Sequence, residues 1–367
     1  MTWRTVKLGE LARVRTGKLD ANAADENGLY PFFTCAVEPL SINTPAFDCK
    51  AILVAGNGDL NVKYYEGKFN AYQRTYVIES LDEKIILPRY LYLFLNEYVN
   101  ELRALAIGGV IKYIKLANLT DAPIPLPPLE EQQRIAAILD KAELLKRMRE
   151  MVIEKLDELA KNIFIEMFGA EIKNSKSKVA DFFIINDNKL NIRMNDEELI
   201  PFVPMAAVSE ITKSVSDIQF RKFKEVKKGY TPIKKGDLII AKITPCYENG
   251  KMALVNEITN DFAFGSTEFH TIRADNLNYL YLLFYYLDSA GIRKGGALNM
   301  KGAAGQRRVP AEYFSKLPFY IPNKEQIAKF VKIINKIKFE RKIHCDSLEN
   351  ICNLQYSLKS QAFSGQL

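Results

Sequence analysis

The segment PIPLPPLEEQQRIAAIL (residues 123–139) has a counterpart of the same design much later in the chain, PFYIPNKEQIAKFVKII (residues 318–334). Both pass from a proline-rich, strand-like run through P-x-x-E-Q into a long pattern of helical periodicity. The shared motif is Pro128, Glu131 and Gln132 in the first copy and Pro322, Glu325 and Gln326 in the second. The sequence therefore predicts two equivalent junctions between a globular part and a long helix.

The repeat extends on both sides of these junctions. RYLYLFL (residues 89–95) is matched by NYLYLLF (278–284), and IFIEMFG (163–169) is matched by LKSQAFSG (358–365). The order of the matching segments is the same in both halves, and their spacing far exceeds that of a solenoid repeat. We infer a duplicated unit, and we interpret the YLYL segments as helices that pack in a core.

The globular parts alternate short β-like runs with glycine-containing turns, for example AILVAGNGD (51–59), RTYVIES (74–80), GDLIIAKIT (236–244) and KMALV (251–255). The predicted fold class is α+β. Two mixed α/β domains are joined by two long helices, packed as an antiparallel coiled coil with a pseudo-two-fold internal repeat. The predicted boundaries are 1–128 for the first domain, 129–169 for the first long helix, 170–322 for the second domain and 323–367 for the second long helix.

The composition narrows the class of protein. Of the 367 residues, 48% are hydrophobic and 26% are charged, which is typical of folded domains, and the net charge is +7. The N-terminus does not resemble a signal peptide, and no apolar run is long enough for a membrane span. An odd number of cysteines without a C-x-x-C pair is typical of a reduced compartment. The sequence therefore predicts a soluble, cytoplasmic protein without a membrane partner.

The two long helical patterns each carry an apolar seam with a 3-4 spacing, which is the spacing of a coiled coil. The first seam is interrupted at Arg149, and the second is polar in its middle, at Glu340, His344 and Ser347. A polar middle can fix the register of paired helices. The predicted apolar seam residues are Ile135, Ile138, Leu145, Val152, Leu156, Leu159, Ile163, Phe330, Ile333, Ile337, Ile351, Leu354 and Leu358.

Each seam needs a partner, and the other long helix is the natural one. Because the helices follow equivalent domains, a two-fold-like arrangement would make them antiparallel. A helix over residues 131–168 would extend roughly 57 Å at 1.5 Å per residue. That length corresponds to one to two turns of DNA at about 34–36 Å per turn. We interpret the helix pair as a ruler between two domains; the alternative is a generic coiled coil that mediates dimerisation.

Catalytic and cofactor signatures are missing from the sequence. There is no G-x-x-x-x-G-K-[ST] phosphate loop, no G-x-G-x-x-G fingerprint and no H-E-x-x-H zinc motif. The N-P-P-Y and D-P-P-Y tetrapeptides of adenine methyltransferases are also absent, and there are only two histidines. We therefore expect a non-enzymatic chain that holds no cofactor and no metal of its own.

Basic residues cluster in loops of both halves. The tract 221–236 has seven basic residues and one acid, and the tracts 291–310 and 106–115 contain no acid. Lysine and arginine neutralise DNA phosphates, arginine contacts guanine, and glutamine can pair with adenine. The alternative for each residue is that it is an ordinary solvated surface charge that does not contact DNA. The candidate DNA-contacting residues are Lys63, Tyr72, Gln73, Arg74, Lys112, Tyr113, Lys115, Arg221, Lys222, Lys224, Lys227, Lys228, Lys242, Lys251, Lys301, Gln306, Arg307 and Arg308.

Several stretches together resemble the specificity (S) subunits of type I restriction–modification enzymes. The resemblance covers essentially the whole chain, and its most specific parts are the two P-x-x-E-Q junctions. The stretches are WRTVKLGEL (3–11), FNAYQRTYVI (69–78), GDLIIAKITPCYENGKMALV (236–255), PLPPLEEQQRIAAILDKAELLKRMR (125–149) and SLKSQAFSGQL (357–367).

The resemblance implies a function. In this family two target-recognition domains, each followed by a long helix, read the two halves of an asymmetric, bipartite site in double-stranded DNA. The helices dock two methyltransferase (M) subunits, which modify adenine at N6 with S-adenosylmethionine. Restriction (R) subunits add ATP- and Mg-dependent cleavage. The resemblance thus places S-adenosylmethionine, ATP and Mg in partner subunits.

Other readings remain open from the sequence. The chain could be a free-standing DNA-binding protein that dimerises through its coiled coil, or a specificity chain of another multi-subunit restriction type. A methyltransferase with an unrecognised site would bind S-adenosylmethionine by itself, and the missing motifs disfavour it.

Overall fold

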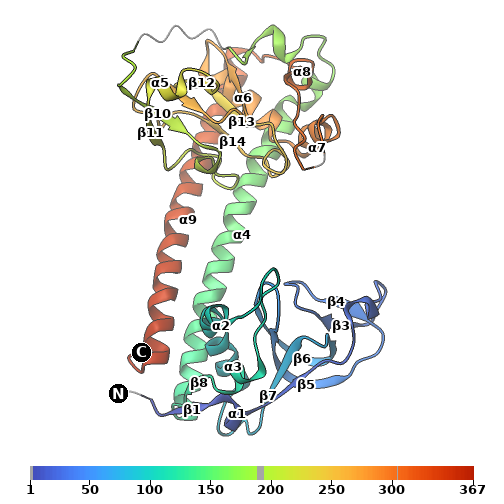
Figure 1. The fold of residues 1–367 in the computed structure, drawn as a ribbon. Helices are drawn as coiled ribbons and strands as arrows, with labels where there is room; N and C mark the ends of the chain where they lie inside the picture. Colours follow the sequence, from blue (N-terminus) through green and yellow to red (C-terminus); the bar gives the residue numbers. More distant parts are fainter. Residues whose placement is uncertain (1–2, 188–193, 304) are drawn as a thin grey trace. The chain divides into compact units, whose positions relative to one another are not determined.

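The computed structural model describes residues 3–187, 194–303 and 305–367, and these form two compact units (Figure 1). Unit 1 comprises residues 1–151 and 344–367, and unit 2 comprises residues 152–343. Both unit boundaries fall inside long helices, so each unit contains one section of helix α4 (Leu129–Lys173) and one section of helix α9 (Lys324–Ser364). Helix α4 continues past the predicted end at residue 169, and α9 is unbroken through its polar middle.

Unit 1 is built on one six-stranded sheet with the strand order β2-β7-β5-β6-β3-β4. Neighbouring strands are antiparallel except for β3 and β6. A separate pair, β1 and β8, joins the N-terminus to the proline-rich run before α4. The elements are β1 Thr5–Lys7, α1 Leu8–Leu11, β2 Ala12–Thr16, η1 Ala21–Ala23, β3 Tyr30–Phe33, β4 Leu40–Ile42, β5 Phe47–Ala55, β6 Val62–Ala71, β7 Thr75–Ser80, α2 Pro88–Leu105, α3 Leu116–Thr120 and β8 Pro123–Pro125.

Unit 2 has two four-stranded sheets, β11-β10-β15-β12 and β14-β13-β16-β9. Within them only β10 and β15 run parallel. The elements are η2 Val179–Asp181, β9 Ile184–Ile185, β10 Leu199–Val203, η3 Met205–Ala207, β11 Gln219–Lys222, α5 Phe223–Val226, β12 Thr231–Lys234, β13 Leu238–Ala241, β14 Met252–Leu254, β15 Phe262–Gly265, β16 Phe269–Arg273, α6 Leu277–Leu287, α7 Ala290–Leu298 and α8 Ala311–Ser315.

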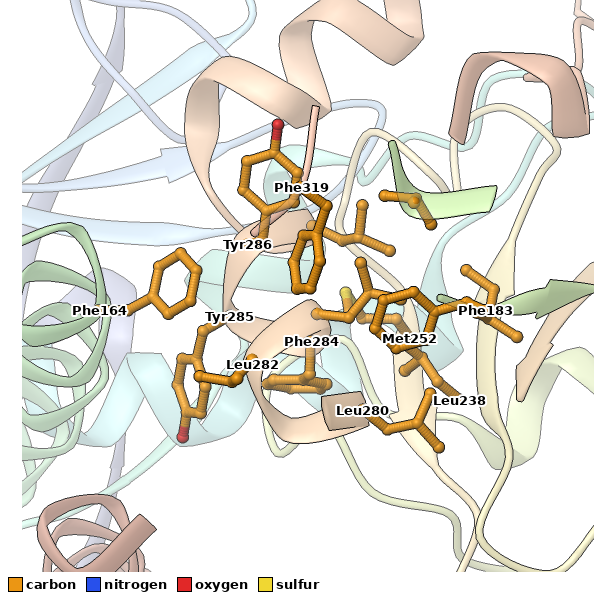
Figure 2. Close-up of a cluster of buried hydrophobic side chains, with 14 of the residues drawn as sticks. Phe164, Phe183, Leu238, Met252, Leu280, Leu282, Phe284, Tyr285, Tyr286 and Phe319 are labelled. Carbon is orange, nitrogen blue, oxygen red and sulfur yellow. The ribbon is translucent and has the colours of Figure 1, made fainter. Parts of the chain in front are cut away.

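The two YLYL segments lie in the equivalent helices α2 and α6, and both pack in cores as predicted. Helix α2 starts with Pro88 in its first turn, where the missing N–H leaves no hydrogen bond unmade. It covers β5 and β6 on one side and packs against α4 on the other (Figure 1). In unit 2, Figure 2 shows Leu282, Phe284, Tyr285 and Tyr286 of α6 among the aromatic side chains of the core.

The long helices run antiparallel within each unit. In unit 1 the Gln355 amide donates to the Glu143 carboxylate (2.7 Å), and Arg134 donates to the carbonyl of Leu367 (2.6 Å). The residue with the higher number on α4 is therefore paired with the residue that has the lower number at the C-terminal end of the chain, as in antiparallel helices. In unit 2 the Asp157 carboxylate accepts from Arg341 at 2.6 Å. Farther along, the Phe168 ring packs edge-on to the Phe330 ring, with 5.4 Å between the centroids. This contact also requires the two helices to run antiparallel.

The predicted seam register is wrong at four positions. Leu145, Val152, Leu159 and Leu354 are exposed. Apart from the predicted Ile135, the buried apolar positions on α4 are Ala136, Leu139, Ala142, Ile153, Ala160, Phe164, Phe168 and Ile172. Several of these lie four residues apart, because in each unit the helix section buries a side against the globular part of that unit as well as against the other helix. A strict coiled-coil seam faces only one partner.

The other predicted seam positions are buried or half-buried. Ile135, Phe330 and Ile337 are buried in the cores of their units. Residues of intermediate exposure are Ile138, Leu156, Ile163, Ile333, Ile351 and Leu358. Leu156, Ile163 and Ile333 pack against the core of unit 2, and Leu358 packs against that of unit 1.

The first P-x-x-E-Q motif is used as a buried hydrogen-bonded junction. The Gln132 side chain is fully buried, and its oxygen accepts from the Leu87 N–H at 2.9 Å. Its amide nitrogen donates to the carbonyls of Ile85 and Pro127, also at 2.9 Å. One side chain thus joins the start of α4 to the chain that enters α2, and it satisfies three backbone groups that would otherwise be unpaired.

The second P-x-x-E-Q motif has a different role. Gln326 accepts from the Asn323 N–H (3.1 Å), and Asn323 accepts from the Gln326 N–H (2.9 Å). This reciprocal pair is a capping box that satisfies the first turn of α9.

We expect Gln132→Ala to lower the free energy of unfolding by roughly 3 kcal/mol, because it leaves buried backbone groups without partners. Urea unfolding of the full chain measures the change. The neighbouring Gln133 is exposed, so Gln133→Ala is a matched control with an expected effect within about 0.5 kcal/mol. Equal effects of the two substitutions would contradict the role of Gln132.

Candidate nucleic-acid interface

Three loops of unit 1 meet where strand β5 ends. The Gly56 N–H donates to the carbonyl of Arg74 at 2.8 Å, and the Gly56 carbonyl accepts from the Ile114 N–H at 3.0 Å. Two residues on, the Gly58 N–H donates to the carbonyl of Lys112 at 2.9 Å. The loop after β5 therefore connects the turn containing Arg74 to the segment containing Lys112, which are distant in sequence.

The first of these loops is the turn between β6 and β7, which carries three of the predicted residues. Tyr72 is half-buried and bridges to Leu19. Gln73 is exposed, and its amide donates to the Asp20 carboxylate at 3.2 Å. Arg74 is exposed and forms no ion pair with a described residue. The turn thus presents one amide and one guanidinium at the surface.

The second loop is a hairpin of residues 107–113, here named hairpin 1. Its base is closed by Ile107 and Tyr113, whose N–H and carbonyl groups exchange hydrogen bonds at 3.0 and 2.8 Å. Lys112 is exposed in the hairpin, and Lys115 is exposed just beyond it. The structure therefore brings the predicted residues at 72–74 and 112–115 together at one edge of unit 1.

Lys63 and Arg103 lie near this edge with their charged groups engaged. The Lys63 ammonium donates to the Asn61 side chain, and burial lowers the pKa of Lys63. Arg103, which the sequence reasoning missed, donates to the carbonyl of Leu60 at 2.7 Å. Its place at the C-terminal end of a helix with no other nearby basic residue offered no pattern by which to select it.

Unit 2 repeats the arrangement at the end of strand β13. The carbonyl of Lys242 accepts from the Val309 N–H at 2.8 Å, and the Thr244 N–H donates to the carbonyl of Arg307 at 3.0 Å. Residues 301–308 form hairpin 2, of which residue 304 is outside the described residues. Its base is closed by Lys301 and Arg308, which exchange backbone hydrogen bonds at 2.9 and 2.8 Å.

Hairpin 2 contributes exposed Lys301, Gln306 and Arg307, whereas Arg308 is committed to an ion pair. The Arg308 guanidinium binds the Glu268 carboxylate through two hydrogen bonds of 2.9 and 2.8 Å. This contact lowers the pKa of Glu268. Arg308 therefore holds the hairpin base in place, and the groups open to a ligand are those of the other three residues.

The basic tract 221–228 is less available than its sequence suggests. Glu197 pairs with Lys222 at 2.7 Å and also with Lys224, and Asp196 pairs with Lys227 at 2.6 Å. Arg221 stacks on the Phe202 ring, with its guanidinium carbon 3.7 Å from the ring centroid. Among the described residues, only Lys228 of this tract has no such partner, so the charged groups of the other four candidates already have contacts within unit 2.

A cleft of about 630 Å³ lies in unit 2 beside this tract. It is lined by aromatic Phe223 and Tyr230 and by the lysines Lys227 and Lys242. Burial lowers the pKa of Lys242, while the nearby Glu268 carboxylate opposes that shift. Lys251 lies elsewhere in the unit and donates to the carbonyl of Met205 at 3.2 Å. Two of the predicted lysines, Lys227 and Lys242, therefore line the cleft, whereas Lys251 does not.

A buried histidine positions hairpin 2. One ring nitrogen of His270 donates to the carbonyl of Val309 at 2.8 Å, and the other lies 2.9 Å from the side-chain amide of Asn186. Burial lowers the pKa of His270 below its usual 6.5. Because Val309 follows the hairpin directly, a neutral His270 fixes the point where the hairpin leaves the core.

No group of three or more His, Cys, Asp or Glu side chains that could hold a metal ion lies among the described residues. No helix in this part of the chain is both long and apolar enough to cross a bilayer.

Comparison with known proteins identifies related sequences. Residues 1–157 match the family of the type I restriction modification DNA specificity domain. The chain is 40% identical over 209 residues to the Escherichia coli type I restriction enzyme EcoDI specificity subunit, a match that covers 55% of this chain and 46% of that protein. It is 33% identical over 227 residues to the E. coli EcoAI specificity subunit, covering 61% of this chain and 36% of that protein. The chain spans less than half the length of these curated relatives.

Solved structures share the fold. The type I restriction–modification S subunit of M. genitalium has a TM-score of 0.59 at 15% identity, covering 99% of this chain and 96% of that chain. A chain from a study of complex assembly and conformational transition of the type I R-M system has a TM-score of 0.55 at 15% identity, covering 100% and 98%. The overall likeness extends over both units, well beyond the residues of the family match.

We expect acid to weaken unit 2 through His270. Below about pH 6.5 the unfolded chain takes up a proton at this histidine while the folded chain does not, so the free energy of unfolding falls as the pH drops from about 6.5 toward the lower folded-state pKa. His270→Gln should be less stable at pH 7.5 but lose less of its melting temperature between pH 7.5 and 5.5. Equal losses in wild type and His270→Gln would contradict this role.

Proposed function

We propose that this chain, a member of the specificity (S) subunit family of type I restriction–modification systems, recognises a bipartite, asymmetric site in double-stranded DNA. The observation that carries the proposal is the repeated loop arrangement. In each unit a hairpin joins the end of a central strand through the same backbone hydrogen bonds, and exposed basic residues project there. Each unit then reads one half-site.

The charges at these edges suit a phosphate backbone. Arg74, Lys112 and Lys115 in unit 1 and Lys301 and Arg307 in unit 2 are exposed, and none takes part in an ion pair between described residues. Basic residues without acidic partners can release counterions from DNA, which is the main source of sequence-independent affinity. By this criterion the paired lysines of the tract 221–228 contribute less.

The two long helices set the spacing between the half-sites in this proposal. Helix α4 has 45 residues and α9 has 41, which at 1.5 Å per residue makes each rod roughly 60–68 Å long. Two weak sites on one stiff spacer gain affinity through effective concentration when the spacing fits. The length of the unspecified gap in the DNA then becomes part of the recognised sequence.

The same helices would dock two methyltransferase subunits. On α4, Leu144, Met148 and Met151 are exposed at i, i+4 and i+7, which places them on one face of the helix within unit 1. An exposed apolar stripe is typical of a protein interface, and methionine adapts well to a partner surface. The methyltransferase subunits would supply the S-adenosylmethionine chemistry at adenine N6, and restriction subunits would supply ATP- and Mg-dependent cleavage. The chain itself acts without catalysing a step.

The decisive experiment is to express the chain with a methyltransferase subunit and to map methylated adenine in the host DNA. The expected result is one bipartite motif that appears only when both chains are present. Arg74→Ala with Lys112→Ala should weaken binding to that motif at least tenfold at moderate salt and lower the slope of log affinity against log salt by about 2. A free-standing DNA-binding protein would bind its site equally well without the methyltransferase.

The docking stripe gives a separate prediction. Leu144→Glu with Met148→Glu should abolish co-purification of the methyltransferase and leave the melting temperature nearly unchanged, because both positions are exposed. Leu29→Glu, at another exposed leucine of unit 1, is the matched control and should retain the partner. Full retention of the methyltransferase by the double variant would contradict docking at this stripe.

The ruler gives a third prediction. Inserting seven residues into each long helix, after Met151 in α4 and after Ile343 in α9, adds about 10 Å of helix. The preferred gap should lengthen by about three base pairs at 3.4 Å per base pair. A panel of DNAs with different gaps measures the preference, and an unchanged preferred gap would rule the ruler out.

A further inference from the structure

Hairpin 1 ends in an apolar tip. Its sequence from Gly108 to Ile111 is Gly-Gly-Val-Ile; Val110 is fully exposed, and the exposed fraction of Ile111 is 62%. Both side chains are β-branched and lack hydrogen-bonding groups. Exposed Lys112 follows them directly, so the hairpin has an apolar tip with a basic residue next to it. Neither apolar side chain is part of a buried core.

The backbone at the tip is set by glycine. Gly108 has a φ of +122°, and a Cβ added there would come within 2.6 Å of the carbonyl oxygen of Ile111. Any other residue would distort this turn. Nothing lies within 4 Å of a Cβ added at Gly109, so the outer part of the tip is open to solvent. The fold therefore maintains a tight turn whose outermost side chains are apolar.

The equivalent hairpin of unit 2 shows what these positions can do. Tyr113 and Arg308 occupy the same place in the two hairpin bases, because each exchanges backbone hydrogen bonds with the residue that opens its hairpin. Counting back from them aligns Ile111 with Gln306 and Lys112 with Arg307. Glutamine and arginine are side chains that read base edges by hydrogen bonding. The two hairpins thus share a backbone and differ in the chemistry of their tips.

We propose that Val110 and Ile111 read thymine in one half-site by contact with its C5-methyl group in the major groove. This inference rests on the proposed function and names the base contact of unit 1. The thymine methyl is the apolar group that base pairs present in the major groove, and apolar side chains recognise it. The neighbouring Arg74 and Lys112 hold phosphates or guanine beside it, because both are exposed and neither takes part in an ion pair between described residues.

The test replaces each thymine of the bipartite site by uracil, one position at a time, which removes only the methyl group. Binding of the complex of this chain with its methyltransferase is measured by fluorescence anisotropy on each DNA. In wild type, uracil at one or two positions of a single half-site should weaken binding about fourfold for each methyl lost. In Val110→Ser with Ile111→Ser, the same uracil positions should have no effect.

The matched control is Leu81→Ser with Ile85→Ser. These two residues are exposed in unit 1 near the other end of strand β7 from Arg74, so this variant should keep the wild-type sensitivity to uracil. A site with no sensitive thymine, or a tip variant that keeps the sensitivity, overturns the inference while leaving sequence-specific binding, and hence the proposed function, intact. A complex that prefers no DNA sequence overturns the proposed function itself.

One further outcome separates two kinds of apolar contact. If the tip were inserted between base steps, 2-aminopurine beside it would brighten on binding of the wild-type complex and not of the tip variant, without sensitivity to uracil. That result would overturn methyl recognition and assign the tip to unstacking of the duplex.

Discussion

In each unit, the sections of the long helices bury an apolar side against two neighbours at once, the globular part of that unit and the antiparallel helix beside them. In unit 1 this constraint is met by Ile135 and Leu139, which join the core formed with α2. In unit 2 it is met by Phe164 and Phe168, which pack with Phe330 of α9 and with the aromatic residues of α6 (Figure 2). A helix that serves two neighbours needs a wider apolar stripe than a coiled-coil seam. Within each unit, the helix sections therefore share one core with part of the sheet structure, β5, β6 and β7 in unit 1 and β13, β14 and β16 in unit 2.

The two copies of the duplicated unit share their backbone geometry at the hairpins, whereas their side chains differ. Both units place a hairpin against the end of a central strand with the same pattern of backbone hydrogen bonds, since any residue can supply an N–H and a carbonyl. The side chains at the two P-x-x-E-Q junctions also differ: Gln132 is a buried connector, and Gln326 is part of a capping box. In the proposed function this division is useful, because a constant backbone can present different tips to different half-sites.

Charge at the surface is decided by pairing more than by composition. The tract 221–228 is the most basic stretch of the sequence, yet Asp196 and Glu197 neutralise three of its lysines. The shorter tract 106–115 has only two lysines, and both remain exposed without acidic partners among the described residues. An exposed ion pair contributes little stability, but it does reduce the charge that a phosphate would meet. The tract 106–115 is therefore a better candidate for contact with DNA than the more basic tract 221–228.

The sequence alone determined the repeat, the two long helices and the position of their starts, because helical periodicity and the proline-rich junctions are local properties of the chain. It also identified the strands β5, β7, β13 and β14 and the burial of the YLYL helices, which follow from short apolar runs. Tertiary structure decided the seam register at Leu145, Val152, Leu159 and Leu354, the loss of free charge at Lys222, Lys224, Lys227 and Arg308, and the meeting of Arg74 with Lys112. The physical reason is the same in each case: which face of a helix is buried, and which acid neutralises which base, depend on neighbours that are far away in the sequence and become close only when the chain folds.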